Sequence, residues 1–217
     1  MRAITHAVIL ALLLPLNGCD FARSQWSQFT AGLREATTAP REIKRGAKPE
    51  IIIKGDQITF DGKPLRLRAD VKEWIEVLGP NFRIYRGDLI WDEKGLIAIL
   101  HPQNKSKVRT LSVELNFKQL YEEWDPEYKE SGPGKKGVPK EFFKGYLEIN
   151  GLPIDAQSTI HETNRRAHGE LSISCSRGIN ICSDHARKPG TPLLYFSVDS
   201  RKEQSIIYEV QVDAGFD

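Results

Sequence analysis

No apolar run in the 217-residue sequence reaches the roughly 20 residues that a membrane-spanning helix needs. The apolar run at residues 7–16 is about half that length, so we expect no spanning helix. An excess of charge of one sign is missing as well, because the formal net charge is +2. No basic stripe with interleaved aromatic residues stands out either. These two observations argue against a nucleic-acid partner.

Motifs for catalysis are equally scarce. His161 and His168 do not form an HExxH zinc motif, because they are seven residues apart instead of four. His185 lies beside Asp184, but no G-x-S-x-G elbow accompanies them, and the glycines at residues 132–137 lack Walker spacing. An enzyme would need His185, Asp184 and a serine within hydrogen-bond reach in a deep pocket. We therefore expect that the protein is not an enzyme and that it binds no metal, cofactor or small-molecule substrate.

The N-terminus carries an export signal. Arg2 precedes the apolar run, which leads into Leu16-Asn17-Gly18-Cys19. This tetrapeptide resembles the bacterial lipobox, which implies that residues 1–18 are a signal peptide and that Cys19 carries lipid at the periplasmic face of a membrane. Several acyl chains make such an anchor effectively permanent. The alternative is an ordinary cleaved signal, and the choice between inner and outer membrane stays open.

The three cysteines fit this location. Lipidation uses Cys19 and leaves Cys175 and Cys182, which we expect to form a disulfide in an oxidising compartment. Their spacing does not match CxxC, and no second Cys/His pair lies at ligand spacing, so a metal site is disfavoured.

Two similar folded segments follow the leader. Strand-forming residues 51–53 and 58–60 and the Asp61-Gly62 turn precede an amphipathic helix over residues 71–78, opened by a capping box at Asp70 and stopped by Gly79-Pro80. Further strand candidates at residues 82–85, 89–100 and 108–117 form a meander after this helix. Residues 143–154 and a short helix over residues 159–166 repeat this order, and a second meander follows them. We expect Trp74 and Trp91 to face inward. The predicted class is α+β, with antiparallel sheets each covered by a short helix in two tandem similar modules.

These patterns divide the mature chain into four parts. The predicted parts are a lipidated tether (19–49), a first helix-on-sheet module (50–120), a charged linker loop (121–141) and a second module with the disulfide (142–217). The basic residues of the tether, among them Lys44, Arg45 and Lys48, either rest against anionic lipid or are solvated.

Three motifs carry a resemblance to a known type of domain: Gly62-Lys63-Pro64-Leu65, Val77-Leu78-Gly79-Pro80, and Trp91-Asp92 followed by Gly95. The segment from residue 51 to 117 resembles an uncharacterised bacterial domain family with an LG…WDxxG pattern. It is also similar to BamE-like modules and to those of the β-lactamase inhibitory protein. Those proteins bind other proteins, which implies a protein partner here, either a toxin neutralised by an immunity protein or a component of envelope assembly.

The linker loop holds the predicted interface. Tyr121, Trp124 and Tyr128 lie among acidic residues, and an aromatic anchor with a polar rim is typical of binding surfaces. The alternative is that Trp124 packs onto its own domain.

Overall fold

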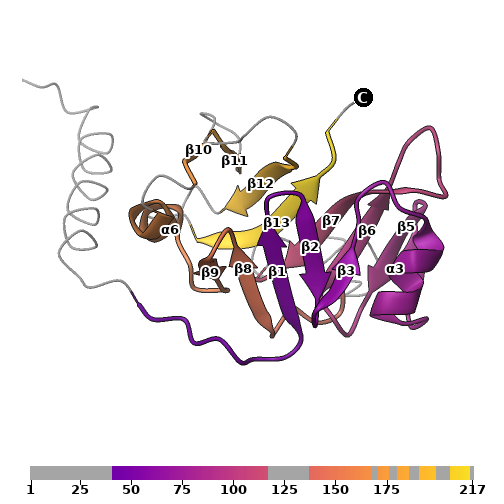
Figure 1. The fold of residues 1–217 in the computed structure, drawn as a ribbon, viewed down its shortest axis with the longest axis horizontal. Coiled ribbons are helices and arrows are strands. Elements are labelled where there is room, and N and C mark those ends of the chain that lie inside the picture. The colour runs from indigo at the N-terminus through magenta and orange to yellow at the C-terminus, as the bar shows by residue number, and fades with distance from the viewer. Residues whose placement is uncertain are drawn as a thin grey trace, which may run out of the picture. The chain divides into compact units, whose positions relative to one another are not determined.

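The computed structural model describes residues 41–116, 137–167, 171–175, 180–185, 191–198 and 206–215. These residues fold into two β-sheets, the smaller of which lies in front of the larger in Figure 1. The smaller sheet has five strands in the order β3-β2-β1-β8-β9, and the larger has eight in the order β10-β11-β12-β13-β7-β6-β5-β4. Each sheet therefore contains strands from both halves of the chain.

Local signals set the elements of the first half. The Asp61-Gly62 turn, in which both residues have positive φ (49° and 78°), joins β2 to β3. Gly79 follows the helix at φ 88°, as predicted. The predicted capping box does not form, because the Asp70 carboxylate lies 3.0 Å from Lys107 Nζ instead. The elements are β1 (Glu50–Lys54), β2 (Gln57–Phe60), β3 (Lys63–Leu65), α3 (Val71–Leu78), β4 (Arg83–Tyr85), β5 (Asp88–Trp91), β6 (Leu96–Leu100) and β7 (Val108–Glu114).

The second half has a similar order of elements. Its helix is capped by Thr159, whose Oγ1 accepts a hydrogen bond from the Glu162 amide at 3.0 Å. The elements are β8 (Tyr146–Ile149), β9 (Leu152–Ile154), α6 (Ile160–Ala167), β10 (Ile173–Cys175), β11 (Ile181–Asp184), β12 (Leu193–Val198) and β13 (Ile207–Asp213).

The predicted α+β class, with antiparallel sheets each covered by a short helix in two tandem similar modules, is wrong. The described part of the chain is mostly β, and its two helices have only eight residues each. The reason lies in two long-range pairings between the halves: β1 runs parallel to β8, and β7 runs antiparallel to β13. Because of these pairings, each sheet contains strands from both halves. The two sheets cover each other, instead of each sheet being covered by a helix.

One hydrophobic core lies between the sheets. Ile51, Ile53 and Leu147 from the smaller sheet and Leu111 and Val210 from the larger sheet are buried in a single cluster. This burial supplies the main stabilising free energy of the fold.

The two tryptophans predicted to face inward belong to this core. Trp74 and Trp91 are fully buried, which confirms the prediction. Their indole N–H groups donate to the carbonyls of Arg66 and Gly79, at 2.9 and 2.8 Å, so neither buried donor lacks a partner.

The end of the predicted tether lies against the folded part. Arg41 donates two hydrogen bonds to the Asp155 carboxylate. Arg45 Nε lies 2.7 Å from Glu50, and Lys48 Nζ lies 3.1 Å from Asp61. Burial raises the pKa of Asp155, but the hydrogen bonds from Arg41 and the Gln157 amide outweigh it and leave that pKa lowered. Residues 41–48 thus contact acidic groups of the smaller sheet and of the loop after β9.

Candidate functional site

The predicted site residues fall into two groups. Cys19, Tyr121, Trp124 and Tyr128 lie outside the described residues, and their roles stay predictions. Cys175 and Cys182 form the predicted disulfide.

The disulfide joins directly opposed residues of the β10–β11 hairpin. The Cys182 side chain is 1% exposed and belongs to the core, whereas Cys175 is exposed. In the chain-entropy model a loop of this length contributes about 2.5 kcal/mol to stability. The bridge therefore fixes one edge of the larger sheet.

His185 lies on the same hairpin. Its Nε2 is 3.4 Å from the Ser183 hydroxyl at an exposed position. Asp184 Oδ1 accepts a hydrogen bond from the Ser172 amide, and the His185 amide donates to the Ser172 carbonyl. The Ser172 contacts tie the two strands of the hairpin together, and the His185 side chain lies exposed at the surface.

Two buried carboxyl groups face each other near the middle of the larger sheet. Glu114 on β7 and Glu209 on β13 are directly paired in register, and both are less than 8% exposed. Ser112 and Ser197 donate hydroxyl hydrogen bonds to Glu209, and Gln211 Nε2 donates to it at 2.6 Å. Three hydrogen-bond donors thus satisfy the oxygens of the Glu209 side chain.

Glu114 has the opposite surroundings. Its Oε1 lies 3.2 Å from the Ser112 hydroxyl, and its Oε2 accepts no hydrogen bond from the described residues. Burial, followed by repulsion from Glu209, raises the pKa of Glu114 well above its usual range. Its surroundings therefore favour the protonated form of Glu114 over the ionised form.

Sequence reasoning gave no sign of this pair. The alternation of Val113, Glu114 and Leu115 suggests one buried face, but both faces of β7 are buried. The signal that could have identified it is the run of polar residues at every second position, Thr110, Ser112 and Glu114 on β7 and Glu209, Gln211 and Asp213 on β13. Two such runs match only if the strands pair, which one strand alone does not reveal.

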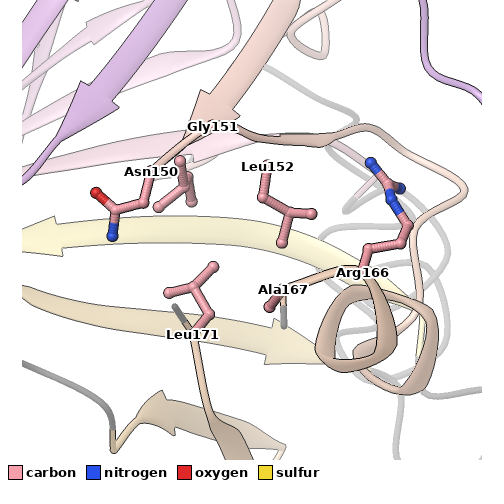
Figure 2. Close-up of a pocket in the computed structure, with 7 residues that line it drawn as sticks. Asn150, Gly151, Leu152, Arg166, Ala167 and Leu171 are labelled. Carbon is pink, nitrogen blue, oxygen red and sulfur yellow. The ribbon is translucent and has the colours of Figure 1, made fainter. Parts of the chain in front are cut away.

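A small hollow lies between the β8–β9 turn and the end of α6. It has a volume of about 200 Å³, and Figure 2 shows Leu152, Ala167 and Leu171 gathered around it, while the ends of Asn150 and Arg166 point away. Asn150 Oδ1 accepts from the Gly55 amide, and Arg166 Nη2 donates to the Pro153 carbonyl. The lining of the hollow is mostly apolar, and both Asn150 and Arg166 make hydrogen bonds to the backbone.

The edge strand β4 presents the most exposed large apolar side chain of the described residues. Ile84 is 68% exposed, although it sits at the centre of this three-residue strand. β4 pairs only with β5 and ends the larger sheet. An exposed edge with an apolar side chain can accept a further strand, so we take β4 as the candidate binding site.

Two further properties concern the described residues alone. None of their helices is long and apolar enough to cross a membrane. No group of three or more His, Cys, Asp or Glu side chains among them could hold a metal ion.

Comparison with known proteins identifies one family. The model described as "Domain of unknown function (DUF7738)" matches residues 50–164, more than half of the 217-residue chain. This region runs from β1 into α6 and contains β4, whereas the disulfide hairpin lies beyond it. No curated protein and no solved structure matches the chain.

Proposed function

The chain belongs to this family of unknown function, DUF7738, and from its own residues we propose that it is a lipid-anchored periplasmic protein that acts by binding another protein. Its role is recognition rather than catalysis. The proposed partner is a secreted toxin, which would make the chain an immunity protein.

Two features support the location. The leader ends in Leu16-Asn17-Gly18-Cys19, which resembles a lipobox. The Cys175–Cys182 disulfide suits an oxidising compartment, because thiols in the cytosol are kept reduced. Lipid on Cys19 would hold the folded part at a membrane surface.

Replacing the lipidated residue tests the anchor. We expect the full chain to incorporate an alkyne-tagged fatty acid and to sediment with membranes. Cys19→Ser should remove the label and release the protein from the membrane fraction, because no acyl chain then holds it. Cys182→Ser, which removes a cysteine of the folded part, is the control and should keep the label. Recovery of the intact chain in the cytosol with free thiols would overturn the proposal.

The observation that carries the binding proposal is the exposed Ile84 at the centre of the edge strand β4. Ile181, the other large apolar side chain that is markedly exposed among the described residues, lies on the inner strand β11. Strand β11 has neighbours on both sides and can accept no further strand. Of these two exposed side chains in the described part of the chain, Ile84 is the one on an edge strand.

Co-expression tests the identity of the partner. Cells that make a periplasm-directed toxin encoded beside this gene are expected to survive when they also make the full chain, because bound toxin cannot act. Chain with Ile84→Lys should protect them less, and chain with Ile181→Lys should protect them fully. Complexes with abundant envelope components in cells that make no toxin would instead support an accessory role in envelope assembly and overturn the immunity role.

A further inference from the structure

We propose that β4 binds an extended segment of the partner protein as an added ninth strand of the larger sheet, and that this segment carries carboxylates beside an apolar residue. The inference rests on the proposed binding function and specifies its site and its mode. The apolar residue covers Ile84, and the carboxylates meet Arg86 and Lys105.

The edges of the two sheets differ in a way that favours β4. The edge strands of the smaller sheet, β3 and β9, each have a proline at their centre, Pro64 and Pro153. Proline has no N–H group and blocks the addition of a strand, which is a common protection of sheet edges. In β4 the central residue is Ile84, which keeps its N–H group.

The hairpin geometry directs the backbone of Ile84 outward. Arg86 and Gly87 form a two-residue turn with positive φ at both positions (53° and 97°). In such a hairpin the residues next to the turn, Tyr85 and Asp88, form the hydrogen-bonded pair, and the following pair does not. The N–H and C=O groups of Ile84 therefore point away from β5, where an added strand would meet them.

The edge is held firmly in place. Arg83 on β4 lies 2.9 Å from the Asp92 carboxylate, and its Nη2 donates to the Val138 carbonyl at 2.7 Å. Just before β4, the ring of Phe82 packs on Trp91, with 5.5 Å between their centroids. A strand fixed before binding loses little conformational entropy when a partner segment pairs with it.

Positive charge marks one end of the edge. Arg86 is exposed, with its guanidinium 5.4 Å from the centre of the Tyr85 ring. Lys105 is exposed too, and its Nζ lies 3.9 Å from where a Cβ of Gly87 would stand. The nearby carboxylate of Asp88 accepts a hydrogen bond from the Leu100 amide. An acidic partner segment therefore complements this end of β4.

Site-specific photo-crosslinking tests the proposal in cells that make the full lipidated chain together with the periplasm-directed toxin of the co-expression test. A photoreactive amino acid is placed at position 84, and in separate chains at the exposed positions 63 on β3 and 181 on β11. We expect at least tenfold more adduct at 84 than at 63 or 181, joined to an extended acidic segment of another protein. A fluorescent peptide of the mapped segment should then bind the full chain in detergent.

Two variants of the full chain separate the roles of the edge and its charge. Ile84→Lys and the double charge reversal Arg86→Glu with Lys105→Glu should each weaken peptide binding about tenfold, and Ile181→Lys should leave it unchanged. Adducts at 63 or 181 alone would leave the binding function standing and overturn the β4 site. Absence of protein adducts at all three positions would overturn the β4 site, and failure of the full chain to protect cells in the co-expression test would overturn the binding function. Adducts at 84 to a second copy, or to residues 117–136 of the same chain, would overturn the proposed partner.

Discussion

Glu114→Gln is expected to make the protein more stable at neutral pH. The glutamine side chain has the shape of the protonated carboxyl group and can donate to Glu209, but it has no proton to lose. In the natural chain, burial and the Glu209 charge raise the pKa of Glu114, so that ionisation is unfavourable in the folded state. The variant avoids that ionisation altogether.

The pH dependence gives the sign of this effect. A carboxyl group whose folded-state pKa is raised contributes stability that is complete below the unfolded-state pKa and is lost as the pH rises toward the folded-state pKa. We therefore expect the advantage of Glu114→Gln in unfolding free energy to grow by about 1.4 kcal/mol for each pH unit across that window. Below about pH 4 the two proteins should agree to within about 1 kcal/mol.

Urea unfolding at a series of pH values measures this difference, and the same exchange on the opposite strand is the control. In Glu209→Gln, an amide N–H group would face the three donors whose hydrogen bonds Glu209 accepts. It should destabilise the protein by about 1 to 3 kcal/mol even at pH 4, where Glu114→Gln changes little. A stability gain in Glu114→Gln that does not vary with pH would show that the pKa of Glu114 is not raised in the natural fold.

The local elements were the predictable part of this fold. The Asp61-Gly62 turn and the stop at Gly79 depend only on residues nearby in the chain, and both occur as predicted. The Cys175–Cys182 disulfide could be predicted because only two cysteines remain after Cys19. Each of these signals lies within a few residues, or follows from simple counting.

The partners of the strands could not be predicted in the same way. Ile53 pairs with Ile149, and Val113 pairs with Val210, about a hundred residues further along in each case. The alternation of apolar residues shows which face of a strand is buried. Many strands show the same alternation, so it does not identify which strands pair. The prediction of two modules did not specify which strands of the two halves pair with each other. The candidate edge β4 was hidden for the same reason, since which strand ends a sheet depends on all the pairings.

Gly145→Ala is expected to destabilise the protein strongly, because it strikes one of these long-range pairings. A Cβ at position 145 would lie 1.8 Å from the Pro49 carbonyl oxygen and 2.7 Å from Phe143 Cζ. The Pro49 carbonyl accepts the Tyr146 amide at 3.0 Å and starts the parallel pairing of β1 with β8. Neither backbone segment can move away without breaking that pairing.

The expected loss in unfolding free energy is about 3 kcal/mol or more, the upper range for overpacking against a rigid neighbour. Gly62→Ala provides the matched control. Gly62 has a positive φ of 78°, yet no atom lies within 4 Å of a Cβ placed there, so the change should cost only about 1 kcal/mol of backbone strain. Urea unfolding of both variants compares the cost of the clash with Pro49 with the cost of backbone strain directly. Equal losses would mean that the contact between Gly145 and Pro49 does not hold the two halves of the smaller sheet together.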